Sequence, residues 1–147
     1  MNLENTVVIV ADLGELKAYR AEQHEGVVGN EMKVSHSLTL VNDESFIEGR
    51  KKLGEVMSDS IGKVGHGTLE SPHLQSEREK RTIKDIAADI EAVVAHINPV
   101  QLFLAFPKEH NHELLNALGE KSKAVLKKNI TSDLVKTDKN KILSHFE

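Results

Sequence analysis

The side chains best suited to chemistry are eight histidines and the aspartates that follow apolar segments. Imidazole and carboxylate groups carry protons and bind metals, so their spacing decides whether they can act together. No two histidines stand four residues apart, the spacing that puts two ligands on one helix face. His110 and His112 would diverge on a helix, which favours exposed polar roles for both. The histidine spacing therefore indicates no metal site.

A glycine-containing segment from Ser60 to Gln75 shows no hydrophobic period and is predicted to be a long loop. Long loops inside small domains often carry function. The candidates at its tip are Gly65, His66, Gly67, His73 and Gln75. His66 and His73 could meet around a divalent ion together with Glu70, although solvent-facing histidines are the more common outcome in such loops.

Two aspartates stand at the ends of predicted strands. Asp12 follows the first apolar run, and Asp133 follows the last one. Such a placement could bring carboxylates together, as in two-metal nucleases. A turn-forming aspartate is the commoner outcome at a strand end, and both interpretations remain open.

Several kinds of chemistry are excluded by what the sequence lacks. There is no cysteine, which removes disulfides, thiolate catalysis and cysteine-ligated metal centres. No glycine-rich nucleotide loop and no Gly-x-Ser-x-Gly elbow is present, so no cofactor is expected. The net charge of -4 argues against wholesale nucleic-acid binding. The stretch 121–141 nevertheless carries seven lysines, for which a solvated surface is favoured over a polyanion contact.

The elements expected to position these residues begin with TVVIVA at 6–11, a strand covered on both faces. Residues 16–20 follow within hairpin distance. Residues 32–40 alternate between apolar and polar side chains and predict a third strand, with His36 on its apolar face. The stretch 45–57 is predicted to be weakly helical.

A long amphipathic helix is predicted to begin at Ser76, where Glu79 completes a capping box, and to stop at Asn98-Pro99. It leads to LFLAF at 102–106, a buried strand parallel to the first. A short helix with leucines 114, 115 and 118, an edge strand at 126–131 and a final helix capped near Thr137 complete the chain.

This order predicts a single α/β domain over 1–147, with a mixed sheet of about five strands flanked by helices. No apolar run approaches the ~20 residues of a membrane span. We therefore expect a cytoplasmic protein without a membrane partner.

Four segments resemble those of a known family. They are VVIVADLGELKAYRA at 7–21, SDSIGKVGHGTLESPHLQSEREKRTIKDIAADI at 58–90, LFLAFPKEHNHELLNAL at 102–118 and NITSDLVKT at 129–137. Over nearly the full chain, the sequence resembles the bacterial host-attachment protein family. That family is regarded as related to the middle domain of archaeal and eukaryotic class I release factors and of pelota.

The resemblance implies a release-factor middle-domain-like fold with a layout related to ribonuclease H. In release factors, the loop before the long helix carries Gly-Gly-Gln, which helps to position a water against the peptidyl-tRNA ester. The comparable loop here offers Gly65-His66-Gly67, and Gln75 is not in register with the family's glutamine. This departure puts ester hydrolysis by that mechanism in doubt.

The function implied is a release-factor-like accessory module that associates with the ribosome or tRNA. Four cations beside the loop are candidates for phosphate contacts: Arg78, Lys80, Arg81 and Lys84. One alternative is a small hydrolase that acts on an ester through the loop histidines, or a metal-dependent nuclease that acts through metal-bound Asp12 and Asp133. Another is a non-enzymatic protein-interaction domain linked to host attachment.

Overall fold

The computed structural model describes residues 3–45 and 72–146 of the chain. A five-stranded mixed sheet in the order β3-β2-β1-β4-β5 forms its centre. The strands are β1 Thr6–Ala11, β2 Glu15–Val28, β3 Glu31–Ser45, β4 Gln101–Ala105 and β5 Leu126–Ile130. The helices are α2 Pro72–Ile97, α3 Lys108–Ala117, α4 Glu120–Val125 and α5 Lys139–Ile142, followed by the 3-10 helix η2 Leu143–Phe146.

Strand β1 occupies the middle of the sheet, and every one of its residues is buried. It pairs antiparallel with β2 and parallel with β4, with Val7 opposite Leu102 and Val8 opposite Phe103. The two apolar pentapeptides predicted to be inner strands therefore lie side by side. The long connection that a parallel pair requires contains β2, β3 and α2, and α2 leads directly into β4.

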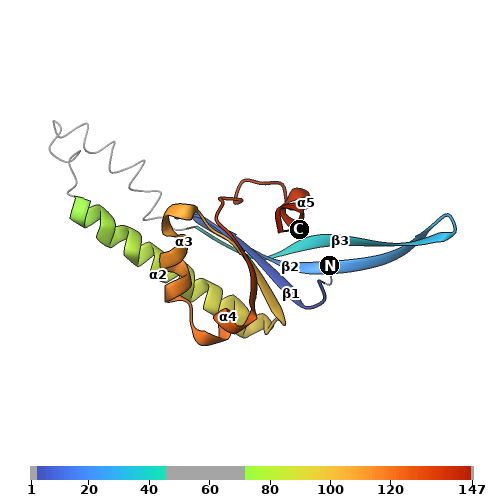
Figure 1. Cartoon of the computed structure of the whole chain (residues 1–147), viewed down its shortest axis with the longest axis horizontal. Helices are drawn as coiled ribbons and strands as arrows, with labels where there is room; N and C mark the ends of the chain where they lie inside the picture. The colour runs from blue at the N-terminus through green and yellow to red at the C-terminus, as the bar shows by residue number, and fades with distance from the viewer. Residues whose placement is uncertain (1–2, 46–71, 147) are drawn as a thin grey trace.

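Each face of the sheet has its own apolar core. On one face, Ile9 and Leu104 pack with Ile86 and Ile90 of α2. On the other face, Val8 and Phe103 pack with residues of the C-terminal segment: Leu134, Val135, Ile142 and Phe146. Figure 1 shows α2 with α3 and α4 on one side of the sheet and α5 on the other. The α/β architecture with a mixed five-stranded sheet is confirmed.

Helix α2 begins at Pro72, one turn before the predicted start at Ser76. Proline is favoured in the first turn of a helix, because its missing N–H has no intrahelical partner there. Ser76 consequently lies inside the helix, and the predicted capping box with Glu79 is wrong as the starting signal. The predicted end is correct, since the helix stops at Ile97 before Asn98-Pro99.

The β2–β3 hairpin extends well beyond the rest of the sheet. The pairing of β1 with β2 reaches only Arg20, whereas β2 and β3 remain paired out to Val28 and Glu31. Residues 23–36, which we call the arm, are all exposed. His36 lies on the same face as Leu38, as predicted, but it is exposed, because no described strand or helix covers that part of the hairpin. Gly29, with a φ of 68°, supplies the left-handed turn at the tip.

The remaining predictions concern the second half of the chain and the segment before α2. Helix α3 and edge strand β5 occur where expected. The final helix is capped near Thr137, as expected, and the capping residue is Asp138, whose side chain accepts a hydrogen bond from the Asn140 N–H. The weak helix predicted over 45–57 lies almost entirely outside the described residues. Within the described part of the chain, no helix is long and apolar enough to cross a membrane.

Candidate functional site

The parallel strands β1, β4 and β5 end at one edge of the sheet, where ligand sites of α/β proteins usually lie. An open pocket of about 640 Å³ is found there. Its lining comes from the segments that follow β1 and β4 and from the chain after β5. The charged and titratable lining residues are Asp12, Glu15, Glu109, His110 and Lys136.

Asp12 shapes the turn between β1 and β2. Its Oδ1 accepts hydrogen bonds from the N–H of Gly14 at 2.7 Å and of Glu15 at 2.8 Å. This is the local side-chain turn that aspartate favours after a strand. The turn-forming interpretation of Asp12 is correct, and the turn also fixes where the carboxyl group stands.

Asp133 forms a similar local bond, with its Oδ1 accepting from the Val135 N–H at 3.0 Å. Its carboxyl group also hydrogen-bonds with that of Asp12. The pKa of Asp133 is raised above its ordinary value, first by partial burial of the carboxyl and then by the hydrogen bond and charge of Asp12. The Val135 N–H and the Lys136 ammonium oppose this rise. The structure thus joins two carboxyl groups that are 121 positions apart in the sequence.

His110 enters the same pocket from the first turn of α3. Its Nε2 lies 3.8 Å from Glu79 Oε2 on α2, and its side chain is only 20% exposed. Its Nδ1 is buried and finds no hydrogen-bond partner among the described residues. The sequence interpretation of an exposed polar histidine is wrong for His110 and correct for His112, which is exposed. The position of His110, directly after a buried strand and Pro107, was the signal that could have placed it at this edge.

Carboxylates outnumber cations around this pocket. Glu15 is partly offset by Lys17 at 3.7 Å, and Lys136 stands near Asp133. An excess of negative charge favours protons or cations over phosphate groups. Within the described part of the chain, no three histidine, aspartate or glutamate side chains are arranged to hold a metal ion. The arrangement is suited to proton transfer between carboxyl groups.

The predicted loop-tip residues separate into two groups. Gly65, His66 and Gly67 lie outside the described residues. His73 and Gln75 were predicted in the loop, and the structure places them in the first turn of α2. The earlier start of the helix at Pro72 accounts for this difference.

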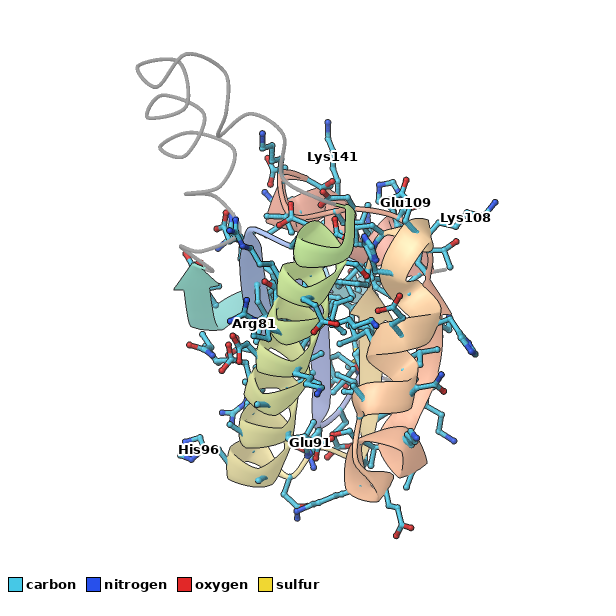
Figure 2. The ribbon with its side chains drawn as sticks, turned by 90° about the vertical axis from the view of Figure 1, so that its left-hand side faces the viewer. Arg81, Glu91, His96, Lys108, Glu109 and Lys141 are labelled. Atoms are coloured by element: carbon cyan, nitrogen blue, oxygen red, sulfur yellow. The ribbon has the colours of Figure 1, made fainter. Side chains whose placement is uncertain are left out.

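The four predicted phosphate contacts lie on α2 but do not form one cluster. Lys80, Arg81 and Lys84 are exposed, whereas Arg78 is half-buried. Lys80 and Lys84 are four residues apart and share one side of the helix. Figure 2 shows Arg81 on the side away from α3, together with His96. The exposed acids of residues 77 and 85 interrupt this surface.

The lysines of residues 121–141 are distributed over several elements. Lys128 donates to the Phe146 carbonyl oxygen, and its Nζ lies 5.4 Å from the centroid of the Phe103 ring. Lys128 therefore fastens the C-terminal segment to the sheet. The others in this stretch are exposed, as expected for a solvated surface: Lys121, Lys123, Lys127, Lys136, Lys139 and Lys141.

Comparison with known proteins identifies the family. No curated protein matches the chain. Residues 7–146 match the family described as "Protein required for attachment to host cells". The match begins at the second residue of β1 and includes the other four strands, the carboxyl-edge pocket and the arm. The chain therefore belongs to the family of proteins required for attachment to host cells.

Proposed function

We propose that this domain is a release-factor-like accessory module that associates with the ribosome or tRNA without Gly-Gly-Gln hydrolysis. The observation that carries the proposal is the exposure of Lys80, Arg81 and Lys84 on the outer surface of α2. Phosphate contacts require cations that reach solvent, and the sequence resemblance implies such contacts beside the loop that precedes this helix. The mixed sheet with α2 packed across it supports a release-factor middle-domain-like, ribonuclease H-like layout.

The charge pattern defines how RNA would be bound. The acidic pocket repels phosphates, so the RNA backbone lies along α2 rather than at the carboxyl edge. The acids between the cations keep the attraction modest, and the binding depends strongly on salt. The described residues include a single tyrosine, Tyr19, which is buried, so base stacking contributes little.

Ribosome co-sedimentation tests this proposal. The double change Arg81→Glu with Lys84→Glu is expected to weaken association about tenfold or more at low salt and to reduce the salt slope by roughly two. The matched control is Lys139→Glu with Lys141→Glu, which alters the net charge equally on α5, across the sheet. Retained binding in this control and loss in the α2 variant supports the proposal. Equal loss of binding in the two double variants contradicts it, and so does the absence of the unaltered chain from the ribosomal fraction at low salt.

A second candidate, a small hydrolase, is favoured by the hydrogen-bonded carboxyl groups of Asp12 and Asp133. Two carboxyl groups that share a proton can supply one acid and one base. His110 stands in the same pocket. The metal-dependent form of this candidate has two carboxylates in place, and the described residues supply no third ligand.

Hydrolysis of a chromogenic ester checks this candidate. We expect slow turnover by the unaltered chain and a loss of about 100-fold or more in Asp12→Asn and in Asp133→Asn, the usual size of a general acid–base contribution. Asp138→Asn is the control, because Asp138 is the exposed cap of α5 and lies outside the pocket. If the unaltered chain and the three variants all turn over the ester at the same rate, the pocket is not a hydrolytic site.

A further inference from the structure

The arm presents large apolar side chains to solvent. Met32 and Val34 on β3 are 68% and 50% exposed, and Val27 of β2 is 72% exposed. Val27 lies directly opposite Met32, and Val34 lies opposite Glu25 on the same face. This face continues inward through Leu38, which belongs to the core beneath α5. The apolar surface of the second core thus extends onto the arm.

Strand β3 is also the outermost strand of the sheet, so its outer edge has no strand partner among the described residues. A long edge strand with apolar side chains is a template for a further strand. A two-stranded hairpin is only marginally stable in water, and additional strands stabilise it. Pairing of β3 with a further strand would therefore stabilise the arm.

The sequence of β3 is complementary to itself. On one face it reads Met32, Val34, His36, Leu38 and Leu40, which is apolar on both sides of a central histidine. An antiparallel second copy centred on His36 would place Met32 opposite Leu40 and Val34 opposite Leu38. On the other face, Lys33 would meet Thr39 and Ser35 would meet Ser37. No like charges meet in this register.

Neighbouring registers that keep the same faces together are less favourable. Centring the pair on Ser37 would bring Glu31 opposite Asp43, and like charges directly opposite each other are destabilising. Centring it on Ser35 would leave Leu40, which is 47% exposed, without an apolar partner. The charges and apolar positions of β3 thus select the register centred on His36.

We propose that β3 is a self-association edge, through which two copies of this chain pair antiparallel about a two-fold axis at His36. The interface is isologous, since each copy contributes the same strand. The two arms together make a four-stranded sheet, and their apolar stripes merge into one surface. This inference is independent of RNA association, which involves α2.

The absence of cysteine allows a direct test of the register. Opposite Cα atoms in antiparallel strands are about 4.5–5.5 Å apart, which lies within disulfide range. The single-cysteine variant His36→Cys is expected to form a disulfide-linked dimer readily on mild oxidation. Val28→Cys is the control, because residue 28 is exposed on the arm but lies on β2, away from the free edge. Efficient dimer formation by His36→Cys alone supports the proposal, and equal or absent cross-linking in the two variants overturns it.

Analytical ultracentrifugation of the intact chain provides a test without cross-linking. The unaltered protein is expected to dimerise as its concentration rises. Val34→Lys places an ammonium in both halves of the apolar stripe and is expected to weaken the dimer by about tenfold or more. Val28→Lys, at a site 60% exposed on the opposite face, is expected to leave it intact. Circular dichroism checks that both variants are folded. A monomer at every concentration would overturn the proposal and leave the arm to a different protein partner.

Discussion

At the scale of single residues, the pairing of Asp12 with Asp133 is the least expected feature of the carboxyl edge. The Oδ1 of each aspartate accepts a hydrogen bond from a nearby backbone N–H and so stabilises its own local turn. The two turns then bring two like-charged groups into contact. Such pairs are costly when both members are ionised, and they are found where a perturbed pKa serves function.

This pairing predicts a pH-dependent stability. Because the folded state raises the pKa of Asp133, it holds the proton more tightly than the unfolded chain does. The contribution to stability is therefore full below the ordinary pKa of 3.8 and is lost as the pH rises through the raised value in the folded protein. At neutral pH, Asp133→Asn should stabilise the protein by about 0.5 kcal/mol, a small value because the site is largely exposed.

Thermal melts between pH 4 and 7.5 measure this effect. The gain from Asp133→Asn should shrink as the pH falls towards 4, since protonation of the aspartate then removes the same repulsion. Asn keeps the acceptor for the Val135 N–H, so the local turn is preserved. Asp138→Asn, at the start of α5, makes the same chemical change away from Asp12 and serves as control. A constant difference between Asp133→Asn and the unaltered chain would show that the folded state does not raise the pKa of Asp133.

At the scale of elements, α2 has the largest structural role. It leads directly into β4 and covers one face of the sheet with residues that include Ile83, Ile86 and Ile90. Its opposite side carries the cations proposed to bind RNA. A change on the buried side should therefore affect stability, whereas a change on the exposed side should affect binding.

Substitution of Ile90, which is fully buried, tests this division. Ile90→Ala is expected to lower the free energy of unfolding by about 2–5 kcal/mol, because it removes apolar contacts and leaves a cavity. Lys84→Ala, on the exposed side of the same helix, should change it by less than about 0.5 kcal/mol. Urea denaturation followed by circular dichroism gives both values. A loss below about 1 kcal/mol in Ile90→Ala would indicate that α2 is not firmly packed on the sheet.

At the scale of the whole molecule, the three surfaces occupy different places. The outer side of α2 carries the exposed cations, the carboxyl edge carries the acidic pocket, and the arm projects from the far end of the sheet (Figure 1). The proposed RNA association, hydrolysis and self-association therefore involve different residues and should be separable by mutation.

The sequence determined the elements whose signals are local. Three sequence patterns each predicted an element and its buried residues. They are the β-branched run of β1, the apolar run of β4 and the helical spacing of the isoleucines in α2. The stop at Asn98-Pro99 was equally local. The start of α2 was missed because Pro72 permitted another turn before Ser76. His36 was misplaced because alternation shows which residues share a face, not whether anything covers it.

Tertiary structure alone decided which distant groups meet. Asp12 and Asp133 were candidates from the sequence, yet only the parallel arrangement of β1, β4 and β5 brought their turns together. His110 joined them because α3 begins at the same edge, next to α2. Periodicity is set within a few residues, whereas contact between remote side chains depends on how strands are ordered in the sheet. For that reason the sequence defined the core of this protein, and the fold defined its pocket.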